Sequence, residues 1–207
     1  MSVRFTWFVE ELVARYGTEH KEETRRRIIE TAGRRFKQDG IDGSGVATLM
    51  KDAGLTNGAF YAHFGSKEDL VAAVVAAELH TQAENIAAAA PGRTGLVDVV
   101  YEYLSPQHRD NPNVGCPSAA LLDEVGRCAE GTKRAYTDGA EAIIQEMATR
   151  LAPEDPRSAR ATTIGLYTML VGTMQLARAV ADRELSDEIL AQGLRNALAL
   201  MGEQPRG

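Results

Sequence analysis

Apolar residues recur at helical spacing along most of the chain. Between residues 22 and 39 they fall three or four positions apart, which lines one face of an α-helix, and Gly40 ends the run. The positions on this face are Ile28, Ile29, Ala32 and Phe36. No strand-like alternation of β-branched residues persists anywhere in the sequence. The pattern therefore predicts an all-α protein.

Two short helices are predicted next, at 46–53 and 57–64, with a glycine turn between them. Gly54 suits a tight turn because glycine adopts positive φ without steric cost. Thr56 is a favourable N-cap for the second helix. Two short helices at a steep angle are typical of a helix-turn-helix, whose second helix enters the major groove of DNA while the first crosses the backbone.

A long helix follows, and Ser66 with Asp69 resembles a capping box at its start. Its apolar repeat continues towards Ala90, where a Pro-Gly pair ends it. Later helices are predicted at 95–104, 117–127, 132–151, 158–181 and 186–202. The stretch 105–115, rich in Pro, Asp and Asn, is predicted to be the longest loop.

The first sixteen residues carry a further apolar stripe at helical spacing. It consists of Phe5, Phe8, Val9, Leu12, Val13 and Tyr16. So apolar a stripe predicts a helix that docks on the body of the protein or on a partner subunit, with a disordered upstream segment as the alternative. We expect three parts: a helical extension over 1–20, a helix-turn-helix domain over 21–66, and a helical ligand-sensing and dimerisation domain over 67–207.

The net charge of −6 is unevenly distributed. Residues 21–67 hold nine lysines and arginines against six acids, an excess of three positive charges, whereas the remainder has an excess of nine negative charges. Only the N-terminal segment has the sign that suits phosphate groups. A solvated basic face would have the same composition, so the charge supports DNA binding without establishing it.

Several other classes of protein fit the sequence poorly. The most apolar run, 164–177, is too short to span a bilayer, and the first twenty residues lack the apolar stretch of a signal peptide. Two cysteines make neither a disulfide framework nor a zinc site, and no catalytic motif is present. We expect a cytoplasmic protein without membrane contact, metal, cofactor or enzymatic activity. A helical adaptor is the alternative class, but it does not explain the basic segment.

Two segments carry a family resemblance. RRRIIETAGRRFKQDGI (25–41) and AGLTNGAFYAHFGSKEDL (53–70) resemble the DNA-recognition region of the TetR family, and the match covers about 50 residues. The resemblance implies a dimeric repressor that binds a palindromic operator in double-stranded DNA and is released by a small molecule. The residues that would then face DNA are Ser44, Thr56, Asn57, Gly58, Tyr61, His63 and Lys67.

The resemblance also suggests what these residues do. Asn57 can present a donor and an acceptor to a base edge, and Lys67 would hold a phosphate. The family usually has Thr where this chain has Gly45, so Ser44 is expected to serve as the helix cap and phosphate contact instead. We expect Phe60 and Phe64 to anchor the recognition helix in a small core. His63 has an alternative interpretation as a surface residue without contacts.

Small and apolar residues form a stripe on the last two predicted helices, where they allow close helix packing. The resemblance implies that these helices pair with those of a second subunit in a four-helix bundle. The residues assigned to this interface are Gly165, Met169, Gly172, Leu176, Leu190, Gly193, Leu194 and Ala197. An intramolecular hairpin that buries the same stripe is the alternative.

Cys116 is the candidate sensor. The segment NPNVGCPSAALLDEVGR (111–127) resembles the TetR subgroup that includes the repressor of the N-ethylmaleimide-reductase operon, where the matching cysteine senses electrophiles. Cys116 directly precedes a predicted helix start, and His108 and Arg109 are near in sequence; amides and cations of this kind favour a thiolate. Alternatively, Cys116 is a small buried side chain, or lines a pocket for an apolar ligand in a redox-insensitive repressor. Cys128, at a helix end, is interpreted as structural.

Overall fold

The computed structural model describes the backbone of residues 3–206 and the side chains from residue 19 onward. Within this range the chain forms ten α-helices and one 3-10 helix and has no strand, as the pattern predicted. The predictions for the side chains of residues 1–16 lie outside the described residues. No helix in the described part of the chain is long and apolar enough to cross a membrane.

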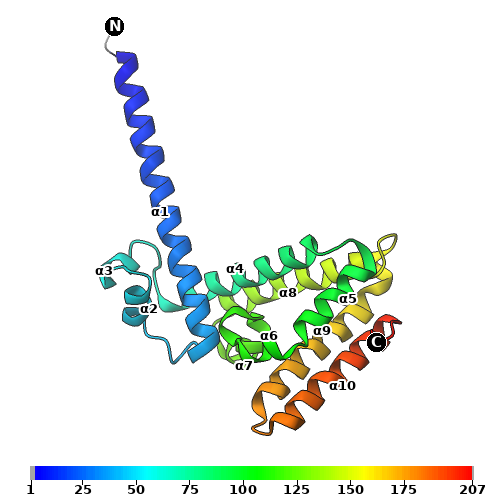
Figure 1. Cartoon of the computed structure of the whole chain (residues 1–207). Helices are drawn as coiled ribbons and strands as arrows, with labels where there is room; N and C mark the ends of the chain where they lie inside the picture. Colours follow the sequence, from blue (N-terminus) through cyan, green and yellow to red (C-terminus); the bar gives the residue numbers. More distant parts are fainter. Residues whose placement is uncertain (1–2, 207) are drawn as a thin grey trace.

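The first helix, α1 (Val3–Asp39), begins much earlier than the sequence pattern placed it, and its N-terminal half extends away from the rest of the molecule (Figure 1). The helix continues through residues 17–21 because this stretch has no proline, and one glycine does not end a helix. The expected division between residues 20 and 21 thus falls inside a helix. The helix ends at Gly40, which has a φ of 80°.

The helix-turn-helix consists of α2 (Val46–Asp52) and α3 (Asn57–Phe60), joined by a turn in which Gly54 has a φ of 68°. The third helix is shorter than the predicted 57–64. Beyond Phe60 the chain continues in tight turns, with the His63 amide donating to the Phe60 carbonyl at 2.9 Å. The next helix, α4 (Lys67–Ala88), has Ser66 as its N-cap, and the Ser66 hydroxyl accepts from the Asp69 amide at 3.1 Å. The predicted cap is confirmed.

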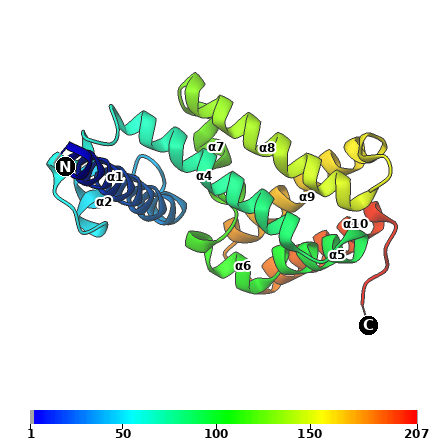
Figure 2. The same ribbon diagram turned by 90° about the horizontal axis from the view of Figure 1, so that it is seen from above.

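The C-terminal part is a bundle of helices. Its elements are α5 (Gly92–Tyr103), α6 (Pro106–Asp110), the 3-10 helix Pro112–Val114, α7 (Pro117–Arg127), α8 (Glu130–Leu151), α9 (Pro156–Ala179) and α10 (Arg183–Met201). Helices α4 and α8 lie side by side, as both views show (Figures 1 and 2). Their close approach depends on Gly139, because a Cβ there would lie 2.5 Å from the Leu79 Cβ.

The stretch 105–115 is largely helical, which corrects the prediction of a long loop. Ser105 caps α6 by accepting a hydrogen bond from the His108 amide at 3.1 Å, and Pro106 occupies the first helical turn. Proline and Asn/Asp clusters are typical of loops, but here they mark the starts of two very short helices. This segment packs against α1 through the 3-10 helix and against α9 through α6.

Candidate DNA-binding face and sensor pocket

The outer face of α3 is polar and open to solvent. Thr56, Asn57 and Gly58 are exposed, and Tyr61 has 71% of its surface exposed. The opposite face is closed by Phe60 and Phe64, which are buried and stack with ring centroids 5.7 Å apart. The prediction that these two rings anchor the recognition helix is confirmed. Because the rings fix α3 from behind, its front presents an ordered polar surface.

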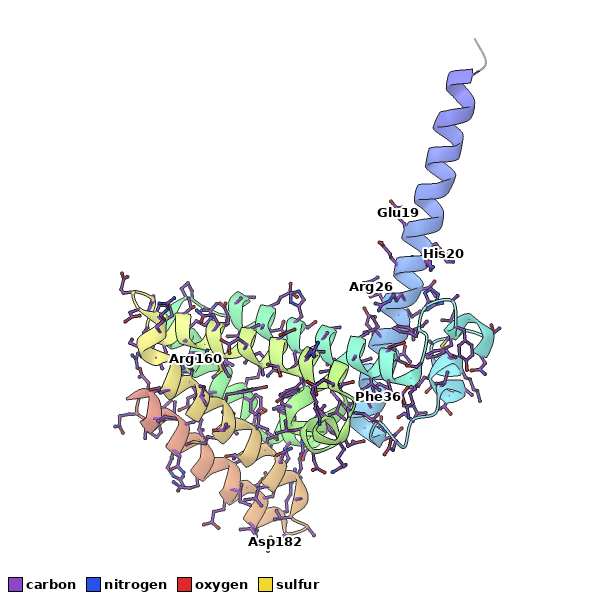
Figure 3. The ribbon with its side chains drawn as sticks, turned by 180° about the vertical axis from the view of Figure 1, so that it is seen from behind. Glu19, His20, Arg26, Phe36, Arg160 and Asp182 are labelled. Atoms are coloured by element: carbon purple, nitrogen blue, oxygen red, sulfur yellow. The ribbon has the colours of Figure 1, made fainter. Side chains whose placement is uncertain are left out.

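Basic side chains of α1 flank this surface. The Arg25 guanidinium lies 4.8 Å from the centroid of the Phe64 ring, a cation–π contact next to the recognition helix. Figure 3 shows His20 and Arg26 on the part of α1 that rises above the body. Sequence reasoning counted these charges but did not assign Arg25 to the site. The run of three arginines at 25–27 was the available signal.

His63 lies half-buried behind the recognition helix. Burial lowers the pKa of His63, and the positive charges of Lys21 and Arg25 lower it further. Its Nδ1 atom is buried and has no hydrogen-bond partner among the described residues. Because Nδ1 is buried, only the Nε2 edge of the ring is available for a hydrogen bond to DNA. Its contact with DNA stays a prediction.

Ser44 does not cap α2, which corrects the sequence assignment. The cap position is Gly45, and Ser44 is 2% exposed with its hydroxyl donating to the Gly40 carbonyl at 2.9 Å. Carbonyls at the end of a helix lack a partner within the helix, and the Ser44 hydroxyl donates to one of them. This hydrogen bond keeps the Ser44 side chain inside the protein. A buried hydroxyl in this position cannot reach a phosphate.

Lys67, at the start of α4, is also tied to the end of α1. Its Nζ donates to the Ile41 carbonyl at 2.6 Å. An ammonium group carries three donors, so two remain for a phosphate. The Lys67 phosphate contact therefore stays a prediction that is compatible with this geometry.

A cavity of about 800 Å³ lies between α4, α5 and the segment from α6 to the start of α7. Its wall includes the side chains of Gln82, Tyr103, His108 and Cys116. Three carboxylates also line it, and no lysine or arginine does among the described residues. The carboxylates are Glu78, Asp98 and Glu102. The volume is in the range that proteins use for small molecules.

Cys116 lies in the wall of this cavity and is 6% exposed. It is the N-cap residue of α7, but its thiol makes no capping bond and instead donates to Gln82 Oε1 at 3.2 Å. The Cys116 amide donates to His108 Nε2 at 3.0 Å. The expected position before a helix start is confirmed, whereas the thiol itself faces α4.

Hydrogen bonds at both ring nitrogens fix the tautomer of His108. Nε2 accepts from Cys116, so Nδ1 carries the proton and donates to the Tyr103 carbonyl at 2.7 Å. Burial lowers the pKa of His108, partly offset by the bond to Tyr103; Arg178 and Lys37 lower it and Glu102 raises it by smaller amounts. The ring is therefore held neutral near pH 7.

The cations beside the Cys116 loop are Arg178 and Lys37, not Arg109. Arg109 is buried and bonds Asp110, Ser186 and Asp187, so it is directed towards α10. Arg178 comes from α9, and its Nη2 donates to the His108 carbonyl at 2.8 Å, while Nη1 is buried and has no partner among the described side chains. Burial lowers the pKa of Arg178, and Tyr103 and Cys116 raise it by smaller amounts. The assignment of Arg109 as the activating cation is thus wrong.

The state of His108 predicts a loss of stability in acid. Its pKa is lower in the folded chain than in the unfolded chain, so the neutral ring contributes fully above about pH 6.5, and the contribution is lost as the pH falls below that value. Lowering the pH from about 7.5 to about 5.5 should reduce the free energy of unfolding of the parent more than that of His108→Gln, because glutamine does not titrate. Urea unfolding at each pH measures this free energy. An equal loss in both proteins would contradict a neutral, buried His108.

The stripe assigned to the dimer interface falls on two different faces. Leu190 and Ala197 are buried against α9 of the same chain, and a Cβ on Gly193 would lie 2.3 Å from the Thr173 Cγ2. These three residues therefore form the intramolecular hairpin, which corrects their assignment. Gly172 and Leu176 instead lie on the outer face of α9, and Leu176 is 53% exposed. Gly165, Met169 and Leu194 are half-buried.

Metal ligands do not gather at either site. In the part of the chain with described side chains, no three His, Cys, Asp or Glu residues are grouped so that they could hold a metal ion. The polar groups that line the cavity are amides, carboxylates, hydroxyls, a phenol, an imidazole and a thiol. Such a lining suits an organic molecule, and the thiol adds the capacity for a covalent bond.

Comparisons with known proteins agree with this geometry. The sequence profile of the family described as "Bacterial regulatory proteins, tetR family" matches residues 28–74. The chain is 40% identical over 58 residues to the HTH-type transcriptional regulator AcrR of Shigella flexneri, covering 28% of this chain and 27% of AcrR. It is 33% identical over 87 residues to the HTH-type transcriptional repressor AcnR of Corynebacterium diphtheriae, covering 42% of this chain and 43% of AcnR. Both alignments span less than half of the relative.

The fold is similar over a greater length. The crystal structure of reduced NemR from E. coli superposes with a TM-score of 0.68 and 21% sequence identity, covering 84% of this chain and 95% of NemR. The helix-turn-helix thus lies in the segment that matches by sequence, and the helical remainder matches by fold. The sequence match to the tetR family of bacterial regulatory proteins covers residues 28–74, and the likeness of the remaining residues to known proteins is one of fold.

Proposed function

We propose that this protein is a cytoplasmic, homodimeric repressor that binds a palindromic operator and is released from it by a small molecule. The observation that carries the proposal is the exposed polar face of α3, fixed from behind by Phe60 and Phe64 and flanked by basic residues of α1. Asn57 would contact a base edge, and Lys67 a phosphate.

A dimer follows from the operator that such a protein requires. Two helix-turn-helix units contact half-sites about 34–36 Å apart, so their separation must be held by a subunit interface. The exposed Gly172 and Leu176 on α9 support an interface on that face. Small and apolar side chains on an open helix allow close packing against the same helix of a second subunit.

Release is proposed to begin in the cavity behind the DNA-binding domain. Its volume suits a small organic molecule, and Cys116 in its wall could react with an electrophile. An adduct on Cys116 would remove the hydrogen bond to Gln82 and add bulk at the start of α7. A change in the separation of the two recognition helices then lowers operator affinity.

Replacing the thiol separates covalent sensing from simple ligand binding. Cys116→Ser should bind the operator like the parent but remain bound after treatment with N-ethylmaleimide or hypochlorite, because serine does not form these adducts. Gel-shift titration on the DNA upstream of the gene, with and without each reagent, measures this. Cys128→Ser is the matched control and should respond like the parent.

Release of Cys116→Ser as readily as the parent would contradict covalent sensing. That result would favour the alternative repressor, in which an apolar ligand fills the cavity and Cys116 only lines it. If the parent does not bind the upstream DNA at all, the repressor proposal itself fails. The helical adaptor would then be the remaining class.

A further inference from the structure

The last turn of α1 is fastened to the loop that carries Cys116. Lys37 has a side chain only 5% exposed, and its Nζ donates to Glu78 Oε2 at 2.6 Å and to the Gly115 carbonyl at 3.2 Å. These bonds connect α1, α4 and the residue before Cys116. The Glu78 carboxylate reaches this position because Gly33 leaves room: a Cβ there would lie 2.3 Å from Glu78 Oε1.

Helix α4 closes the connection into a ring. Glu78 and Gln82 are one helical turn apart and project on the same side. Glu78 holds Lys37, and Gln82 accepts from the Cys116 thiol at 3.2 Å. The chain from Gly115 to Cys116 completes the ring, because its carbonyl is held by Lys37 and its thiol by Gln82. A displacement of this loop therefore disturbs a bond to α1 directly.

A second contact links the same part of α1 to the far end of α7. The Ile41 amide, just beyond the end of α1, donates to Glu124 Oε2 at 2.8 Å. Glu124 lies near the C-terminus of α7, whereas Gly115 lies just before its start. The end of α1 therefore makes a contact at each end of α7, and a shift of α7 changes both contacts.

Because the Lys37 ammonium is charged and buried, losing its bonds to Glu78 and Gly115 would be energetically costly. A buried ammonium without partners is costly, so Lys37 tends to follow its acceptors when they move. We propose that Lys37 transmits a displacement of the Gly115–Cys116 loop to the DNA-binding helices, and thereby couples the cavity to operator affinity. The inference rests on the proposed function, since it concerns how that repressor is released.

The test compares one perturbation in two backgrounds. Cys116→Phe imitates the bulk of an adduct, and operator Kd is measured by fluorescence anisotropy for the parent and Lys37→Met, each with and without Cys116→Phe. In the parent, which retains Lys37, Cys116→Phe should weaken operator binding about fivefold or more. Fivefold is the lower end of the change in affinity that coupling between two sites usually produces. In Lys37→Met, Cys116→Phe should weaken binding less than about twofold. The quantity compared is the ratio of the Kd with Cys116→Phe to the Kd without it. This ratio does not include any effect that Lys37→Met alone has on operator binding.

Two controls accompany this comparison. Lys133→Met removes an exposed lysine from α8, and there Cys116→Phe should weaken binding as much as in the parent. Glu78→Gln preserves the size and the packing against Gly33 while removing the charge that holds Lys37. Glu78→Gln replaces Lys37→Met in the comparison if Lys37→Met does not fold. It should also reduce the loss of operator affinity that Cys116→Phe causes.

The proposal would be overturned if Cys116→Phe weakened operator binding equally in the parent and in Lys37→Met. It would also be overturned if Cys116→Phe did not weaken binding in the parent. A second readout needs no DNA: Cys116→Phe should accelerate hydrogen exchange of the Gly40 amide, which donates to the Phe36 carbonyl at the end of α1, when Lys37 is present and have little effect in Lys37→Met. If the parent binds no operator, the proposed function fails, yet this exchange experiment still decides whether Lys37 transmits the displacement.

Discussion

Gly172→Leu should convert the protein to a monomer and abolish operator binding without unfolding the subunit. Apart from the neighbouring backbone of its own helix, a Cβ at Gly172 would meet no atom of the described residues within 4 Å, so the subunit itself has room for the new side chain. At a two-fold interface the same side chain is introduced twice between closely packed helices, and overpacking costs about 1–3 kcal/mol at each. Sedimentation velocity and operator titration on the same preparation measure the two losses.

Gly193→Leu is the matched control for this experiment. It lies on the neighbouring helix, but a Cβ there would lie 2.3 Å from Thr173 Cγ2 within the same chain. It should therefore lower the melting temperature of the subunit, which Gly172→Leu should not do. A Gly172→Leu protein that remains dimeric would place the interface on another face.

Asn57→Ala should change sequence recognition, whereas Lys67→Ala should change electrostatic affinity. Asn57 is exposed and is proposed to contact one base, so its loss should cost about 1–3 kcal/mol at one operator position only. Lys67→Ala should weaken binding to all sequences and reduce the slope of log K against log salt by about one. Titration of an operator library at several salt concentrations separates the two effects.

Each of these outcomes has a clear opposite. If Asn57→Ala weakens every sequence equally, Asn57 does not read a base. An unchanged salt slope in Lys67→Ala would mean that Lys67 contacts no phosphate and only holds the Ile41 carbonyl. In that case the bond between α4 and the end of α1 is its whole role.

Local signals predicted much of the fold. The bounds of α7 were predicted at 117–127 as found, and Pro117 favours its position in the first helical turn. Phe60 and Phe64 were expected to anchor the recognition helix in a small core, and both are buried. The short helices within 105–115 were missed because proline and asparagine at helix starts have the same composition as a loop.

Contacts between distant residues were beyond the reach of the sequence. Helix packing within a chain and between chains requires the same small residues, so the pattern could not separate Gly193 from Gly172. Arg109 was chosen as the cation because it is near Cys116 in sequence, but Arg178 reaches the loop from α9. The Lys37–Gly115 bond joins positions 78 residues apart and has no local signature.

The central claim is specific recognition of operator DNA, and a salt-dependent binding titration tests it most directly. Labelled DNA from upstream of the gene is compared with a scrambled duplex of equal length. The account predicts that a dimer binds one palindromic site about 10³-fold or more tighter than the scrambled DNA, and that log K falls linearly with log salt. Equal affinity for the two duplexes, or binding that does not change with salt, would contradict it.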